Sequence, residues 1–305
     1  MFRHSFWQQR RLATWRALSV AGVSKGRLAR FGTCGSAAWV MECKTDSSIH
    51  RVVCSRCRDR FCEACASERR RLVANNLYRW LDKRFPVARS HKARIPVRFV
   101  TLTLKATDSP LSATLDRLQK CWCRLRRRKL FASSQKGGLC FLEVKRGKNS
   151  GYWHPHLHAL VEGDYLSQKQ LSRAWHEITG DSFVVHIEAI ADAGKAAQYV
   201  TKYASKALDS SVWQDQDDLV IAIHALAGRR VFATFGSWSG LDLSKNPEDG
   251  LEWFAVISLA KLITAASNGD ADASSLLRSL KERCFYGSGD ISHTQRGSPE
   301  MPSLS

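Results

Sequence analysis

The first 41 residues of this 305-residue chain contain no aspartate or glutamate, although they hold seven lysine and arginine residues. Acidic residues are scarce overall, with 28 against 47 lysines and arginines, which gives a net charge of +19. The excess lies in residues 1–206, because residues 207–305 carry 8 basic and 13 acidic side chains. The bland explanation is a protein made soluble by its charge. A basic body with 10 tryptophans among its basic residues instead favours a polyanionic partner, and nucleic acid in particular.

The sequence also lacks an apolar run long enough to span a bilayer, which predicts no membrane partner. Its basic N-terminus shows no clean cleavage pattern of a signal peptide. We therefore expect a cytoplasmic protein whose ten cysteines are reduced. A glycine-rich phosphate-binding loop of the helicase type is missing too, so unwinding of a DNA duplex would have to come from a partner.

Changes in composition divide the chain into six predicted segments. They are a basic, partly helical arm over residues 1–30, a cysteine-rich module over 31–72, a helical connector over 73–94, a central domain over 95–210, an extension with a strand and an amphipathic helix over 211–286, and a disordered tail over 287–305. The central domain has the clearest alternation of strand and helix patterns.

Hydrophobic periodicity predicts the elements of the central domain. Strands are expected over 97–104, 138–145, 154–161 and 183–190, and helices over 112–131, 167–178 (capped by Ser167) and 192–208. Their order predicts an α+β fold, a ferredoxin-like antiparallel sheet with helices, preceded by the small cysteine-rich module. Outside this domain we expect helices over 66–85 and 251–266 and an extra strand over 229–236.

Two histidines, His156 and His158, alternate in the strand predicted over 154–161. Alternate residues of a strand share a face, so both imidazoles can bind one metal ion. Glu143 on the preceding strand is the candidate third ligand, and imidazoles with a carboxylate favour Mg²⁺ or Mn²⁺. His154, at the entrance of the same strand, is expected to contact substrate. The alternative is a set of polar residues on an exposed strand face.

Two tyrosines, Tyr199 and Tyr203, are four residues apart, and each is followed three residues later by a lysine, Lys202 or Lys206. Residues four apart lie on the same face of a helix, so the two phenols would lie side by side. The lysines can offset the charge of a phenolate. A metal that polarises a phosphate, together with a tyrosine that attacks it, would break DNA and hold its end. A solvated helix face is the alternative.

Cysteines form a second constellation. Two Cys-x-x-Cys pairs, Cys54 with Cys57 and Cys62 with Cys65, follow Cys34. Thiolates at this spacing predict a structural Zn²⁺ site. The gap between the two pairs is short for one ordinary zinc ribbon. Two alternatives therefore remain, in which Cys34 replaces Cys54 as a ligand or a second zinc ion binds.

A dense basic run closes the helix predicted over 112–131. Its members are Arg124, Arg126, Arg127, Arg128 and Lys129. Such runs are usually solvated helix faces. The density of this one, beside Trp122, favours contact with the DNA backbone.

The His-x-His strand followed by a Tyr-x-x-Lys helix resembles the HUH endonuclease superfamily, and more closely the rolling-circle replication initiators of plasmids and single-stranded DNA phages. Residues 99–103 are similar to the first family motif, residues 154–160 to the second and residues 199–206 to the third. The doubled tyrosine is similar to that of the phage initiators. Related plasmid initiators carry one tyrosine and a glutamate at the position of Tyr199.

This resemblance implies an enzyme that nicks single-stranded origin DNA through Tyr203, leaving a 5′-phosphotyrosine and a 3′-OH that primes a host polymerase. A host helicase would unwind the duplex, and the zinc module would support origin binding. Tyr199 would then cut the regenerated site so that the strand is rejoined, or would only line the site. Two other functions remain open, an HUH-type transposase or relaxase and a non-catalytic zinc-finger regulator. The intact His156, His158, Tyr203 and Lys206 argue against the regulator.

Overall fold

The computed structural model describes residues 2–86, 95–147, 150–203, 208–245 and 250–286, with the backbone alone for residues 2–7, 203 and 282–286. The chain separates into two compact units, residues 1–37 with 54–250 and residues 38–53 with 251–305. The first unit contains helices on an antiparallel sheet, and so does the second, which confirms the α+β class. The segment predicted as one cysteine-rich module, 31–72, is shared between the units, because residues 38–53 belong to the second.

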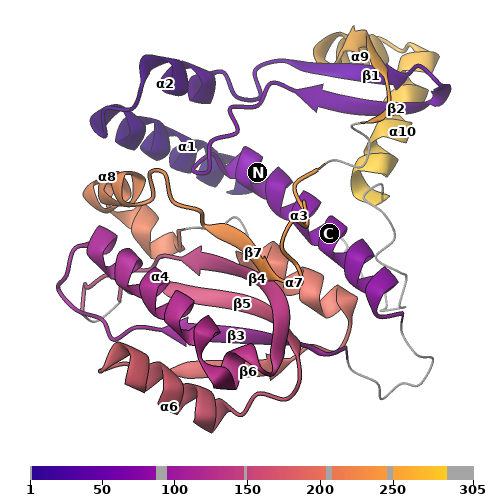
Figure 1. Cartoon of the computed structure of the whole chain (residues 1–305). Helices are drawn as coiled ribbons and strands as arrows, with labels where there is room; N and C mark the ends of the chain where they lie inside the picture. Colours follow the sequence, from indigo (N-terminus) through magenta and orange to yellow (C-terminus); the bar gives the residue numbers. More distant parts are fainter. Residues whose placement is uncertain (1, 87–94, 148–149, 204–207, 246–249, 287–305) are drawn as a thin grey trace, which may run out of the picture. The chain divides into compact units, whose positions relative to one another are not determined.

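Most elements of the two units are labelled in Figure 1. The first unit contains α1 (Phe2–Val20), α2 (Lys25–Gly32), α3 (Glu63–Arg84), β3 (Val97–Thr103), α4 (Leu111–Arg127), α5 (Lys129–Ala132), β4 (Gln135–Glu143), β5 (His156–Gly163), α6 (Gln168–Thr179), β6 (Val185–Ala189), α7 (Ala193–Tyr203), the 3₁₀ helix η1 (Ser210–Gln214), α8 (Gln216–Ala225) and β7 (Phe232–Gly236). The second contains β1 (Ala38–Cys43), β2 (Asp46–Cys54), β8 (Trp253–Ser258), α9 (Leu259–Ser267) and α10 (Ala271–Tyr286). Within the described ranges, every helix is too short or too polar to cross a membrane.

A five-stranded antiparallel sheet with the order β6-β3-β5-β4-β7 is the framework of the first unit (Figure 1). The four strands predicted for the central domain are all present, with only their ends shifted. The extra strand predicted over 229–236 is β7, which pairs with β4. Since β3 and β5 lie at the centre of the sheet, side chains on these strands are held rigidly.

Both faces of this sheet are covered, because alternate side chains of each strand point to opposite sides. Val100 and Leu102 of β3 lie in a core shared with α4, α6 and α8. Phe99 of β3 and Leu160 of β5 lie in a second core shared with α3 and α7. Figure 1 shows α4 and α7 on different sides of the sheet.

The helices of the first unit follow the predicted pattern with one interruption. Arg128 has an extended backbone, with ψ of 141°, and divides the helix predicted over 112–131 into α4 and α5. The predicted cap of α6 is confirmed, since the Ser167 hydroxyl accepts a hydrogen bond from the Gln170 N–H. Gly180 ends that helix in the left-handed region, with φ of 82°, which favours glycine.

The helix predicted over 251–266 is wrong in its first part. Trp253–Ser258 forms strand β8, which pairs antiparallel with β1, and α9 begins only at Leu259. Aromatic and β-branched residues such as Phe254 and Val256 favour extended structure, and pairing with β1 outweighs the helical spacing of the apolar residues. The Ser258 hydroxyl then accepts a hydrogen bond from the Lys261 N–H and caps α9.

The second unit is a three-stranded sheet with the order β2-β1-β8, packed on α9 and α10. Its core contains Val40 of β1, Leu262 of α9 and Leu280 of α10. The extension predicted over 211–286 therefore does contain a strand and helices, but its last part folds with residues 38–53. The tail predicted over 287–305 lies outside the described residues.

A buried carboxylate joins α3 to the sheet of the first unit. Glu162 is 2% exposed and accepts hydrogen bonds from Arg84 Nη2 at 2.8 Å and from Trp238 Nε1 at 2.6 Å. Glu162→Ala leaves the indole N–H buried without this acceptor, so we expect the free energy of unfolding in urea to fall by about 2–3 kcal/mol. Glu177→Ala is the control, because its pair with Arg128, at 3.7 Å, is half-exposed and contributes less than about 0.5 kcal/mol. Equal losses in both variants would contradict the assignment.

Candidate functional site

The three predicted ligands of the catalytic metal lie on adjacent strands. In the strand register, Glu143 of β4 is opposite His156 of β5, and Thr103 and Thr101 of β3 are opposite His156 and His158. The Oε2 atom of Glu143 lies 3.2 Å from Nε2 of His158. The rings of His156 and His158 stack with their centroids 5.9 Å apart. The structure therefore gathers an imidazole pair and a carboxylate at one place on the sheet.

Two threonines fix the orientation of these imidazoles. The hydroxyl of Thr101 is 3.0 Å from Nδ1 of His158, and the hydroxyl of Thr103 is 3.0 Å from Nδ1 of His156. An imidazole held through Nδ1 presents Nε2 for ligation, which is the usual outer-shell arrangement of metal-binding histidines. Sequence reasoning included these threonines only as part of a motif, because their contact with the histidines depends on the strand register.

The protonation states of His156 and Glu143 also suit a cation site. Burial lowers the pKa of His156 to about 3, so this imidazole is neutral near pH 7 and keeps the lone pair needed for ligation. Burial tends to raise the pKa of Glu143, but hydrogen bonds from His158 and from Lys145 Nζ, at 3.1 Å, outweigh it and hold the pKa below its ordinary value. An ionised carboxylate beside the neutral imidazole of His156 belongs to a donor set that suits Mg²⁺ or Mn²⁺.

Distances test how well the three residues fit such an ion. Adjacent ligands of an octahedral cation, each at about 2.1 Å from it, are about 3 Å apart. The 3.2 Å between Glu143 and His158 matches this value. His156 is less well placed, because in the described part of the chain the cysteines, and not this group, bring three or more ligand atoms within 4.8 Å of one another. Glu143 and His158 are thus in contact, His156 lies next to them, and the binding of a cation by the three residues stays a prediction.

The ring of Phe99 lies between Tyr199 and His158 and stacks on both. Helix α7 buries its alanines and Val200 in the core and leaves Tyr199 half-buried at the edge of that core. The phenol ring stacks on Phe99 with centroids 4.1 Å apart, and Phe99 stacks in turn on His158 at 5.5 Å. The Tyr199 hydroxyl donates a hydrogen bond to the carboxylate of Glu188 on β6. Sequence reasoning missed Glu188, for which the strand predicted over 183–190 was the single signal.

The other residues of the predicted tyrosine motif are less fully described. Tyr203 is the last residue of α7, and its side chain is outside the described part of the structure. Lys202 is exposed on α7. Lys206 lies outside the described residues. His154 precedes β5, and its ring centroid is 4.5 Å from that of His156. The roles given to these four residues therefore stay predictions.

The predicted basic run does not lie with the histidines. Leu118, Trp122 and Leu125 of α4 pack into the core on the opposite face of the sheet. Arg126 stacks over Trp122 at 5.4 Å. The remaining members, Arg124, Arg127, Arg128 and Lys129, are exposed. Helix α3 is the better-placed basic element, because it packs against α7 and exposes the arginines Arg69, Arg71 and Arg79.

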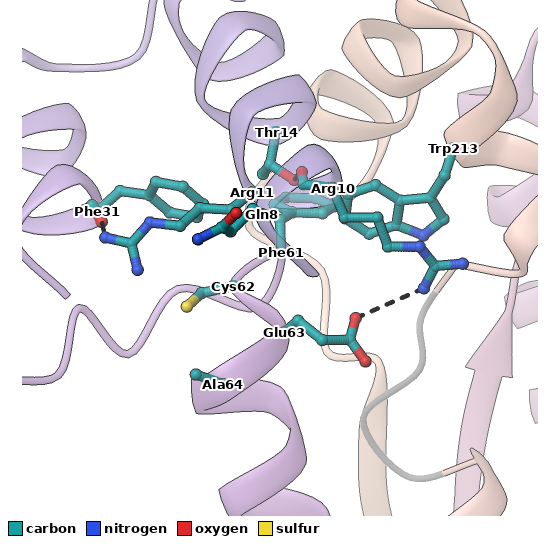
Figure 2. Close-up of a pocket in the computed structure, with 10 residues that line it drawn as sticks. All are labelled: Gln8, Arg10, Arg11, Thr14, Phe31, Phe61, Cys62, Glu63, Ala64 and Trp213. Atoms are coloured by element: carbon teal, nitrogen blue, oxygen red, sulfur yellow. Dashed lines mark hydrogen bonds and ion pairs between the residues drawn. The ribbon is translucent and has the colours of Figure 1, made fainter. Parts of the chain in front are cut away.

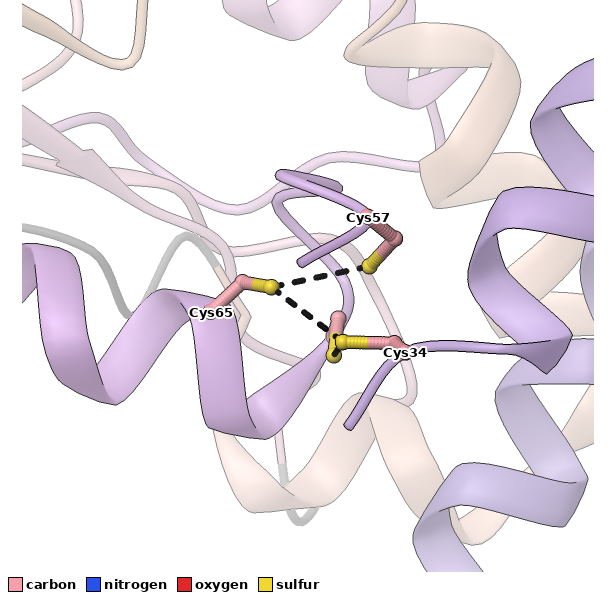
Figure 3. Close-up of side chains that lie close together, drawn as sticks. Cys34, Cys57 and Cys65 are labelled. Atoms are coloured by element: carbon pink, nitrogen blue, oxygen red, sulfur yellow. Dashed lines mark hydrogen bonds between the residues drawn. The ribbon is translucent and has the colours of Figure 1, made fainter. Parts of the chain in front are cut away.

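Four cysteines form a compact cluster, and Figure 3 labels three of them, Cys34, Cys57 and Cys65. The Sγ atoms of Cys34, Cys57, Cys62 and Cys65 all lie within 4.8 Å of one another, and the Sγ of Cys34 is 3.7 Å from Cys62 and 3.5 Å from Cys65. Thiolates at about 2.3 Å from a tetrahedral Zn²⁺ are about 3.8 Å apart, so the cluster is compatible with zinc. Cys54, the last residue of β2, is outside this cluster. Of the two alternatives, the structure supports the one in which Cys34 replaces Cys54.

A tight turn brings these cysteines together. Arg58, directly after Cys57, has a φ of 56°, in the left-handed region, and reverses the chain toward Cys62. Asp59, the next residue in this turn, is fixed by an ion pair with α2. Its Oδ2 accepts a hydrogen bond from Arg27 Nε at 2.6 Å. Burial raises the pKa of Cys65 to about 11, so the thiolate form depends on a cation beside it.

A pocket of about 450 Å³ lies beside the cluster (Figure 2). Arg10 of α1 stacks over Trp213 at 5.4 Å and pairs with Glu63 at 3.7 Å. Arg11 donates hydrogen bonds to the carbonyls of Gly32 and Cys34, each at 2.8 Å. These two arginines of the predicted basic arm therefore hold α1 to its neighbours.

Comparisons with known proteins place this site in context. Residues 50–252 match the family Rep_1, described as replication protein. Protein rep of Streptococcus pneumoniae serotype 2 is 25% identical over 207 residues, which cover 62% of this chain and 62% of that protein. Protein rep of Staphylococcus aureus is 27% identical over 166 residues, 50% of this chain and 70% of that protein. The match therefore spans less than two thirds of the first relative. No solved structure matches the chain significantly.

Proposed function

Because the chain belongs to the Rep_1 family of replication proteins, we propose that it initiates rolling-circle replication by nicking single-stranded DNA at an origin and later rejoining the strand. The observation that carries this proposal is the contact of Glu143 with His158, with Tyr199 one aromatic ring away. A cation site on a rigid sheet beside a helix with two tyrosines is the equipment for phosphodiester transesterification. The strand order β6-β3-β5-β4 supports a ferredoxin-like domain of the HUH type.

In the proposed reaction, the Tyr203 oxygen attacks the scissile phosphorus and the bond to the 3′-oxygen breaks. The 5′-phosphate stays on the tyrosine and the DNA keeps a free 3′-OH. Glu143, His156 and His158 would hold Mg²⁺ or Mn²⁺, which polarises the phosphate when bound. Thr101 keeps the His158 imidazole oriented throughout. Since one phosphodiester replaces another, the link stores the energy needed for rejoining, for which Tyr199 is the second nucleophile.

DNA and replication proteins are the proposed partners. The exposed arginines Arg69, Arg71 and Arg79 of α3 would follow the phosphate backbone next to α7, and the run 124–129 would contact DNA on the other face. The cysteine cluster, with zinc bound, would fix the start of α3. A host helicase and a host polymerase would supply unwinding and extension.

A covalent adduct tests the proposal. The protein is incubated with labelled single-stranded origin DNA and Mn²⁺, and adducts are separated on a denaturing gel. We expect an adduct that EDTA abolishes and that His158→Ala reduces at least about 100-fold, because that variant loses a ligand of the cation. His224→Ala, which changes an exposed histidine of α8, is the matched control and should behave as wild type. An adduct equally abundant in EDTA would contradict the metal-assisted reaction.

A further inference from the structure

The first cleavage proposed above, by Tyr203, leaves the contact of Tyr199 with Glu188 without a role. The Tyr199 hydroxyl donates its hydrogen bond to Oε2 of Glu188, and the phenol ring lies nearly parallel to Phe99, at an interplanar angle of 18°. Glu188 lies directly opposite Phe99 in the pairing of β3 with β6. The carboxylate is therefore built into the sheet beneath the phenol and does not reach it from a loop.

This pair belongs to the same site as the histidines. Phe99 stacks on Tyr199 at 4.1 Å and on His158 at 5.5 Å, so a single ring separates the phenol from a proposed metal ligand. The ammonium of Lys195, one turn before Tyr199 on α7, lies 5.5 Å from the centre of the phenol ring.

We propose that Glu188 is a catalytic residue of the rejoining step, in which it accepts the proton of Tyr199. This inference rests on the proposed nicking function. A general base must lie within hydrogen-bonding distance of the proton that it removes, and the Glu188 carboxylate already accepts that hydrogen bond. Tyr203 makes the first cut, and the Tyr199–Glu188 pair is reserved for the second.

The rejoining step transfers one proton to Glu188 and exchanges phosphodiester bonds. The Tyr199 proton passes to the Glu188 carboxylate while the phenol oxygen attacks the phosphorus of the regenerated origin, and the bond to the 3′-oxygen breaks. That 3′-oxygen attacks the phosphorus linked to Tyr203 and closes the strand. The Tyr203 oxygen leaves and takes up a proton from water, and Glu188 returns its proton to solvent. The numbers of phosphodiester bonds and of protons are unchanged.

Glu188→Gln separates a proton acceptor from a mere anchor. Glutamine keeps the size and one acceptor oxygen for the Tyr199 hydroxyl, but it cannot take the proton. The first adduct is formed with Mn²⁺ and labelled origin DNA, a second origin strand is added, and joined product is followed in a single turnover. We expect adduct formation within about twofold of wild type and joining slower by about 100-fold. Glu177→Gln, the same change on the surface of α6, should join normally.

The dependence on pH gives a second, independent readout. With glutamine at position 188, the phenol must lose its proton to the solvent, so joining should quicken about tenfold per pH unit toward the ordinary phenol pKa of about 10. The groups near the pair, Lys195 and His186 of β6, are present in both proteins, so the difference between the two profiles reports on Glu188. An anchoring role predicts parallel profiles.

Each outcome of these experiments either supports or overturns the role of Glu188 as proton acceptor. Slow joining with normal adduct formation, relieved at high pH, supports Glu188 as the proton acceptor. Normal joining in Glu188→Gln, with joining lost in Tyr199→Phe, overturns it and leaves an anchor. Normal joining in both Glu188→Gln and Tyr199→Phe overturns it as well, because Tyr199 is then not the second nucleophile. Failure of wild type to form any adduct would instead refute the proposed nicking function, which the inference requires.

Discussion

Tyr203→Phe is expected to abolish the covalent adduct with origin DNA while leaving DNA binding within about twofold of wild type. Phenylalanine keeps the ring and removes the oxygen that attacks the phosphorus, so no group at this position can become linked to the 5′-phosphate. The loss should be at least about 1,000-fold, since removal of a nucleophile commonly costs that much or more. Binding should persist because phosphate contacts come from basic side chains elsewhere.

The packing of α7 and a matched control make this result interpretable. Helix α7 is held by its buried face, where Ala196, Ala197 and Val200 pack into the core with α3, so a change at its last residue leaves these contacts intact. Tyr199→Phe is the matched control, because it makes the same chemical change one turn earlier. That variant should form the first adduct and fail in rejoining.

The measurement pairs two assays on the same preparations. A denaturing gel reports the adduct, and retention of labelled origin DNA in a native gel reports binding. Loss of both in Tyr203→Phe would point to misfolding, which thermal unfolding would reveal. An undiminished adduct in Tyr203→Phe, absent in Tyr199→Phe, would exchange the order of the two tyrosines and contradict the assignment of Glu188 to the second step. No adduct from the wild-type protein would leave a zinc-bearing DNA-binding regulator.

The sequence predicts the relative positions of these residues where a local period determines the geometry. The alternation of His156 and His158 places both on one strand face whatever the rest of the fold does, and Glu143 follows from its place on the preceding strand. The structure joins Glu143 to His158 as expected. The roles of Thr101 and Thr103 needed the register of β3 against β5, which no local pattern contains.

Long-range pairing accounts for the rest of what was missed. Glu188 meets Tyr199 because β6 lies next to β3 and α7 packs over that edge, a relation set by tertiary structure. The same holds for β8, whose partner β1 is about 200 residues earlier in the chain and converts an apolar stretch with helical spacing into a strand. Local propensity gave no sign of either contact.

The cysteine cluster supplies the second large effect. Cys34→Ser should remove bound zinc, lowering the affinity at least about 100-fold, because a hydroxyl is a poor replacement for one of four thiolates. Cys54→Ser should retain one zinc ion per chain, since Cys54 lies outside the cluster. Both variants replace a cysteine with a serine, so a difference in zinc content between them reports the position of the cysteine in the fold. Zinc content after dialysis against a weak chelator is the measurement.

The thermal stability of the protein should depend on bound zinc. Cys34 follows α2 while Cys62 and Cys65 begin α3, so a shared zinc ion ties two distant segments of the first unit together. Zinc that binds the folded chain but not the unfolded chain adds its binding free energy to the free energy of folding. We therefore expect chelation to lower the unfolding temperature of wild type and Cys54→Ser, and to leave Cys34→Ser, already lowered, unchanged. Zinc loss in Cys54→Ser with retention in Cys34→Ser would overturn this ligand set, and two zinc ions per wild-type chain would show that a second site exists.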